Sequence, residues 1–135
     1  MSESSEFESG QTEPYLIEVK VMPEYLSHDS EPENERFIFA YHVSIINRGS
    51  VGAQLLNRHW VITDGNGSVD EVHGEGVVGE QPYLEAGEEY MYNSFCVLAT
   101  PVGMMQGSYG MIADDGKLFE AEIPPFMLAA PGKLN

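Results

Sequence analysis

Apolar and polar residues alternate along most of this chain, which is the pattern of half-buried β-strands. The clearest run is RFIFAYHVSIINRG, residues 36–49. One face of this predicted strand consists of Phe37, Phe39, Tyr41, Val43 and Ile45. The other face, apolar enough to be half covered, consists of Ile38, Ala40, His42, Ser44 and Ile46. No window of about a dozen residues shows a helical period, so the pattern indicates an all-β protein.

Further runs of the same kind bring the number of predicted strands to about seven or eight. They cover residues 15–22, 53–63, 68–74, 89–100, 106–113 and 117–123. Turn sequences at Asp64–Gly67 (DGNG) and Asp114–Lys117 (DDGK) predict hairpins. Pro23, Pro101 and the pair Pro124–Pro125 are expected to end strands, because proline cannot donate to a β-ladder.

Short strands separated by turn residues are typical of a β-sandwich or a barrel. The chain has 135 residues, the size of one domain. We predict a disordered acidic N-terminal arm over residues 1–13, a β domain over 14–131 and a C-terminal tail over 132–135. The arm is predicted to be disordered because it has four glutamates, no basic residue and one isolated aromatic residue, Phe7.

The charge balance is strongly acidic, with 22 Asp and Glu against 6 Lys and Arg and a net charge of −16. Such a surface repels phosphates, so we expect no nucleic-acid partner. It favours basic partners, weakly bound divalent cations or high solubility. The sequence has no signal-peptide pattern and no apolar run of about 18 residues, so we predict a cytoplasmic protein without membrane insertion. Cys96 is the single cysteine and lies in an apolar run, as expected of a buried thiol.

A glycine-rich stretch, HGEGVVGEQP, occupies residues 73–82. Gly74, Gly76 and Gly79 match the G-x-G-x-x-G spacing of dinucleotide-binding loops. That interpretation requires a helix after the glycines, and Pro82 leaves no room for one. We therefore expect the glycines to turn a β-chain, with the residues after Gly76 continuing as an edge strand available for docking. An anion held by backbone amides of this loop is the alternative.

Arg58 is the candidate ligand-binding side chain. It alternates with Leu56, Trp60 and Ile62 on one predicted strand face, so a buried guanidinium would need a carboxylate or carbonyl partner. The first interpretation is a structural role. The second is an arginine that anchors an anion together with Gly74, Gly76 and Gly79.

No catalytic residue is predicted, because no serine or cysteine lies in a nucleophile elbow or beside an evident base. The four histidines, His28, His42, His59 and His73, match no zinc signature. We therefore predict no metal site and no cofactor. Two strand histidines and an acid would form a metal site only if neighbouring strands presented them on one face.

Four segments occur together and in order: QLL-x-R-x-W, GEGVVG-x-QP, TP-x-G-x-MQG-x-Y and IP-x-F-x-L. On these segments the chain strongly resembles the ApaG family over residues 15–131. The resemblance implies an immunoglobulin or fibronectin type III-like antiparallel β-sandwich. It also implies a genetic link to cobalt resistance and magnesium efflux, and a protein-interaction role for similar domains.

The resulting functional prediction is a non-enzymatic binding module with an indirect role in Co²⁺ and Mg²⁺ homeostasis. Its partner is expected to be another protein. The alternatives are a sensor of a pyrophosphate- or nucleotide-type anion at the glycine-rich loop, and weak divalent-metal binding by surface acids. The protein is expected to be a monomer or a homodimer.

Overall fold

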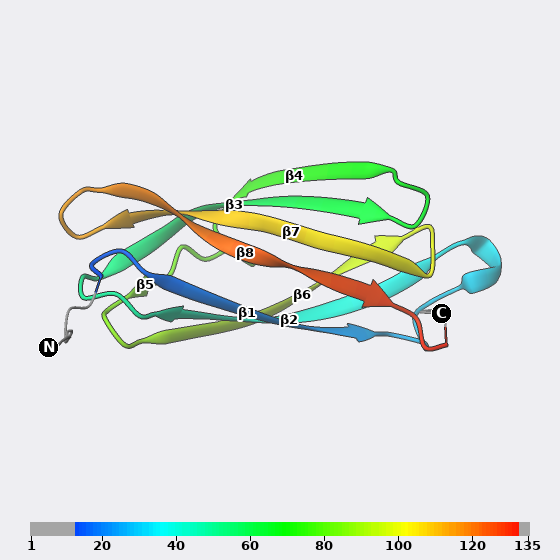
Figure 1. Cartoon of the computed structure of the whole chain (residues 1–135). Coiled ribbons are helices and arrows are strands. Elements are labelled where there is room, and N and C mark those ends of the chain that lie inside the picture. The colour runs from blue at the N-terminus through cyan, green and yellow to red at the C-terminus, as the bar shows by residue number, and fades with distance from the viewer. Residues whose placement is uncertain (1–12, 133–135) are drawn as a thin grey trace, which may run out of the picture.

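Two antiparallel β-sheets packed face to face make up the protein, seen in a computed structural model that describes residues 13–132 (Figure 1). The first sheet has the order β1 (Ile17–Tyr25), β2 (Phe37–Asn47), β6 (Glu89–Leu98). The second has the order β4 (Val69–Glu75), β3 (Ala53–Asp64), β7 (Val102–Ala113), β8 (Leu118–Ala129). The two-residue β5 (Tyr83–Leu84) pairs with the start of β3, and one 3-10 turn, η1 (Pro32–Asn34), precedes β2. The predicted all-β sandwich is confirmed.

The core lies between the sheets and follows the predicted alternation. All five residues of the predicted inner face of β2, Phe37 to Ile45, are buried. Facing strands contribute Trp60 and Tyr109, whose rings meet edge to face with centroids 6.4 Å apart. The largest fully buried side chains come from both sheets. Each sheet therefore covers the inner face of the other.

The prediction that prolines end strands was wrong for two of the three sites. β1 continues past Pro23, which pairs with Tyr41, and β8 runs through Pro124 and Pro125 to Ala129. Both strands lie at a sheet edge, where a missing backbone N–H needs no partner on the outer side. Pro101 does separate two strands, since it lies between β6 and β7.

A bulge in β3 corrects the predicted facing of one residue. The pairing of β3 with β7 shifts register between Leu55 and Asn57. Leu55 therefore points into the core with no exposure, while Leu56 is only half-buried. An extra residue at a bulge reverses the alternation that follows it, so Trp60 still faces inward as predicted.

The described residues cover the whole of the predicted domain, residues 14–131, and little of its flanks. Residues 1–12 of the predicted arm and 133–135 of the predicted tail lie outside them. Glu13, the last residue of the arm, accepts a hydrogen bond from the Ser50 amide at 3.0 Å. Within residues 13–132, no helix is long and apolar enough to cross a membrane.

The two lateral sides of the sandwich differ. On one side β1 lies against β8, so the two sheets meet there (Figure 1). On the other side β6 is the last strand of its sheet and pairs only with β2. We call this side, bordered by β6, β3 and β4, the open side. It is where the predicted site residues lie.

Candidate functional site

The glycine-rich stretch forms the end of β4 and a tight turn. The amide of Val77 donates to the carbonyl of Glu80 at 2.8 Å, and the amide of Glu80 donates to the carbonyl of Val77 at 3.0 Å. The two residues between them, Val78 and Gly79, have φ angles of 49° and 80°. This is a two-residue turn with both central residues left-handed. β5 follows, so no helix N-terminus faces a phosphate here.

The expected docking strand after Gly76 does not exist in that form. The side chain of Val77 is fully buried between the sheets, and its amide is used within the turn. A partner strand therefore has no free edge to pair with at this point. β4 ends at Glu75, and the turn that follows buries the side chain of Val77 at the open side of the sandwich.

Arg58 and the glycine-rich stretch are brought together, as the sequence suggested. The Arg58 Nη1 donates to the carbonyls of Glu75 and Gly76, each at 2.9 Å. The guanidinium lies so close to Gly74 that a Cβ there would stand 2.7 Å from it. The guanidinium is the end of a flexible side chain, so it can shift to make room at Gly74. A Cβ at Gly76, where φ is 63°, would stand 2.2 Å from the backbone oxygen of Glu80, so close approach requires glycine at this position. Gly79 belongs to the turn beyond. The contacts are with carbonyl oxygens, which supports the structural interpretation of Arg58.

A small hollow opens beside Arg58, between β6 and β3. Its lining consists of Tyr41, Arg58, Trp60, Val77, Val78, Tyr92 and Ser94. The volume is about 150 Å³, below the roughly 300–1,000 Å³ of small-molecule sites. The hollow therefore suits one side chain or a small anion better than a nucleotide. We call it the Arg58 hollow.

Tyr92 lines the Arg58 hollow, and its hydrogen-bond partner Tyr109 is fully buried. The hydroxyls of Tyr92 and Tyr109 are hydrogen-bonded to each other. Burial raises the pKa of Tyr92 to about 12 and raises the pKa of Tyr109 further still. Both hydroxyls therefore remain protonated at neutral pH. Residue spacing alone did not reveal this hollow, because its lining comes from three strands that are distant in sequence.

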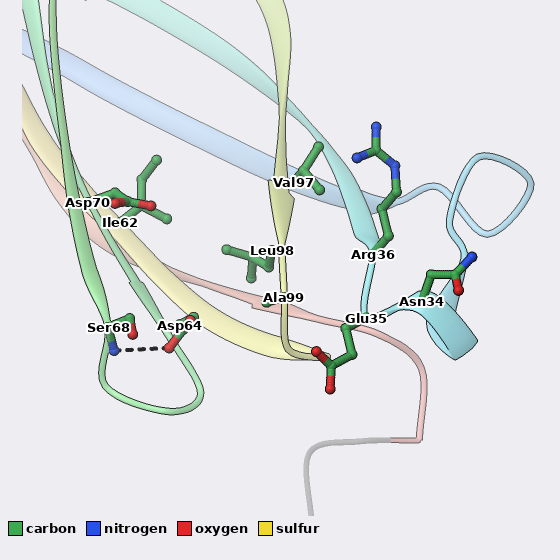
Figure 2. Close-up of a pocket in the computed structure, with 10 residues that line it drawn as sticks. All are labelled: Asn34, Glu35, Arg36, Ile62, Asp64, Ser68, Asp70, Val97, Leu98 and Ala99. Carbon is green, nitrogen blue, oxygen red and sulfur yellow. Dashed lines mark hydrogen bonds between the residues drawn. The ribbon is translucent and has the colours of Figure 1, made fainter.

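A second hollow lies toward the other end of the open side (Figure 2). Figure 2 shows Leu98 of β6 pointing toward Ile62 and Asp70 of the β3–β4 hairpin. The Asp64 carboxylate accepts from the amides of Asn66 and Ser68, at 2.9 and 3.0 Å, which fixes the predicted DGNG turn. Asp70 adds a second carboxylate to the lining of this hollow. We call this second hollow the hairpin hollow.

β6 runs from one hollow to the other. It contributes Tyr92 and Ser94 to the Arg58 hollow, and Val97 and Leu98 to the hairpin hollow. Its outward-facing side chains are apolar and exposed: Met91 68%, Phe95 68% and Val97 44%. An unpaired sheet edge flanked by exposed apolar side chains is a surface that can accept another strand.

Cys96 lies on the inner side of β6, as expected. Its Sγ contacts the Met105 Sδ at 3.8 Å. Burial raises the pKa of the thiol to about 11, so the thiolate is scarce at neutral pH. This matches a structural cysteine and gives no support to a nucleophilic one.

Comparisons with known proteins show the family of the chain and support its fold. The ApaG domain family matches residues 27–113. A protein named Protein ApaG from Aromatoleum aromaticum is 54% identical over 125 residues, covering 93% of this chain and 98% of the relative. Protein ApaG from Pseudomonas putida is 54% identical over 121 residues, covering 90% and 96%. The crystal structure of an ApaA protein from Bordetella pertussis superposes with a TM-score of 0.88 at 46% identity, covering 91% of this chain and all of that one.

Proposed function

This chain belongs to the ApaG family, and from that premise and the open side of the sandwich we propose a non-enzymatic protein-binding module. Its partner docks as an extended segment that adds a strand to β6. Any influence on Co²⁺ and Mg²⁺ homeostasis, which the family resemblance implies, is then exerted through that partner.

The observation that carries this proposal is the unpaired edge of β6. Among the described strands only β2 pairs with it, so backbone N–H and C=O groups on its other side are available. An added strand gains affinity from main-chain hydrogen bonds and specificity from its alternate side chains. Half of those side chains would pack beside Met91, Phe95 and Val97, and the others would face the two hollows.

The charges along the open side predict where a basic residue lies along the docked segment. The hairpin hollow is lined by three acidic residues, Glu35, Asp64 and Asp70, against one basic residue, Arg36. Arg58 lies at the opposite hollow. The net charge of −16 attracts basic segments over distance. We therefore expect a segment with apolar residues at alternate positions and a lysine or arginine at the end that meets Asp70.

Val78 gives independent support. This exposed, β-branched residue has a φ of 49°, a conformation that valine rarely adopts. Neither the exposure nor the conformation helps folding, and strain of this kind concentrates at functional sites. Val78 borders the Arg58 hollow, where a docked segment would cover it.

The test uses the full chain as bait in a bacterial lysate, with two matched variants. Phe95→Glu places a charge on the outward face of β6, and Leu118→Glu does the same on β8 at nearly the same exposure, 67% against 68%. The proposal expects a protein that wild type and Leu118→Glu retain and Phe95→Glu loses. Equal retention by both variants contradicts it. Sedimentation of the pure chain as a β6-dependent dimer would also contradict it, because a second copy would then occupy the edge.

A small anion in the Arg58 hollow is the second candidate function. It is favoured by the guanidinium and the protonated tyrosine hydroxyls that border the hollow. Titration with inorganic pyrophosphate, followed by amide NMR, tests it. Saturating shifts confined to residues 74–80 and to the strand positions around the hollow support this function, and unchanged spectra exclude it.

A further inference from the structure

Three potential metal ligands converge on the outer face of the second sheet, away from β6. His59 of β3 is the direct cross-strand partner of His73 of β4. Glu71 lies two residues before His73, and therefore on the same face of β4. The hairpin register thus places two imidazoles and one carboxylate on one face, which is the condition that the sequence alone left open.

The side chains are already turned toward one another. The imidazole rings of His59 and His73 stack at 4.2 Å between centroids and 10° between planes. The Glu71 Oε1 lies 2.9 Å from the His59 Nε2 and 3.7 Å from the His73 Nε2. The carboxylate is hydrogen-bonded to His59 and lies within ion-pair distance of His73.

We propose that His59, Glu71 and His73 form a binding site for one divalent transition-metal ion of the Zn²⁺ or Co²⁺ type. Their ligand atoms lie within 4.8 Å of one another. A tetrahedral Zn²⁺ with bonds of about 2.0–2.1 Å holds its ligands about 3.3 Å apart, so rotation of exposed side chains suffices. The ion would lie between the two imidazoles and the carboxylate, and water would complete its coordination.

The ligand set selects the class of metal. Imidazole nitrogens suit Zn²⁺, Co²⁺, Ni²⁺ and Cu²⁺, whereas Mg²⁺ requires oxygen ligands. The nearby hollow that His59 and His73 border is also lined by two carboxylates, Glu75 and Glu120, and by one guanidinium, Arg58. The acidic side chains outnumber the basic one there, which favours a dication. A bound ion would clamp the edge strand β4 onto β3, next to the glycine-rich turn.

The first sheet provides a matched control. The His42 Nε2 lies 3.0 Å from the Glu24 Oε1 across β1 and β2, a single imidazole with a single carboxylate. Such a pair supplies two ligands rather than three. It experiences the same net charge of the protein, so it reports any purely electrostatic association.

The experiment is calorimetric titration of ZnCl₂ into the full, untagged chain after EDTA treatment, in about 150 mM NaCl. We expect one Zn²⁺ per chain. His73→Ala and Glu71→Gln should weaken binding by at least the roughly 10–100-fold that loss of an outer-shell partner costs, while His42→Ala binds as wild type does. ZnCl₂ should raise the Tm of wild type but not of His73→Ala, and excess MgCl₂ should not compete.

Absence of saturable binding overturns the proposal, as does unchanged affinity in His73→Ala or an equal loss in His42→Ala. The two ligands that are replaced have exposed side chains, 58% for Glu71 and 70% for His73, so these variants are expected to fold. Amide NMR verifies this. With Co²⁺ as the probe, paramagnetic broadening must centre on β3 and β4, and broadening spread over the acidic surface contradicts the site.

Discussion

At the scale of single residues, Val78 and Arg58 explain the glycine-rich turn. Val78 and Glu35 are the described non-glycine residues with positive φ. Arg58, a side chain from the neighbouring strand, donates to the carbonyls of Glu75 and Gly76 and so anchors the residues that precede the turn. Turn geometry and close packing are therefore sufficient to explain the glycine spacing.

Replacing Val78 separates stability from binding. Asparagine is favoured at the first position of this type of turn, and valine there costs roughly 1 kcal/mol or more. We predict that Val78→Asn raises the free energy of unfolding by about 1 kcal/mol and weakens capture of the partner. Urea denaturation and the lysate assay measure the two effects. A variant that is less stable, or that binds as well as wild type, would contradict the interpretation.

Removing the Arg58 guanidinium has the opposite consequence for stability. Hydrogen bonds to charged groups contribute about 1.5–3 kcal/mol, and two carbonyls would lose their donor. We predict that Arg58→Met, which keeps much of the apolar stem, lowers the free energy of unfolding by about 2–3 kcal/mol. Arg48→Met serves as the control, because Arg48 forms an exposed ion pair with Glu18 that is expected to contribute less than about 1 kcal/mol.

The buried tyrosines make stability depend on alkaline pH. Burial raises the pKa of Tyr92 to about 12, whereas an unfolded tyrosine titrates near 10. Between these values the unfolded chain releases a proton that the folded chain retains, so stability falls as pH rises through that window. We predict a smaller fall in Tyr92→Phe. The remainder is due to Tyr109, Tyr41 and Cys96, whose pKa values burial also raises. Identical pH dependence in denaturant unfolding of both proteins would refute this.

At the scale of elements, the sequence predicted where the strands lie better than it predicted where they end or which strands pair with each other. Alternation identified the inner face of β2 because that face is buried along its whole length. It misplaced Leu56, since a bulge depends on pairing with β7 and leaves no local signal. The sequence predicted that prolines end strands, because it does not show which strands lie at a sheet edge and can contain one. Likewise, the Arg58 hollow and the His59–Glu71–His73 cluster depend on cross-strand register, which residue spacing does not contain.

The pairing of β3 with β7 gives a prediction at this scale. A Cβ added at Gly107 would stand 2.0 Å from the His59 carbonyl oxygen, a backbone atom that cannot move without disturbing both central strands. Overpacking of this kind costs typically about 1–3 kcal/mol, and we predict at least about 2 kcal/mol for Gly107→Ala. The adjacent Ser108→Ala should stay within about 0.5 kcal/mol. Thermal unfolding compares them, and equal stability of the two variants would show that the strands tolerate the added methyl group.

At the scale of the whole molecule, charge and shape act together. The sandwich is closed where β1 meets β8 and open along β6, so one side remains for docking. The net charge of −16 directs basic segments toward the protein. We predict that raising the NaCl concentration slows association with the partner much more than it speeds dissociation. Stopped-flow association rates measure this, and a rate independent of salt would show that long-range attraction plays no part.

The central claim is that β6 accepts a strand from another protein, and amide hydrogen exchange of the complex tests it most directly. Strand addition must slow hydrogen exchange at those amides of β6 (Glu89–Leu98) that point away from β2, along its unpaired edge. The amides of β8, the edge strand that packs against β1, should exchange at the same rate as in the free protein. Protection along β6 is the result expected. Protection on β8 or β4 with β6 unchanged would place the partner elsewhere and contradict the account.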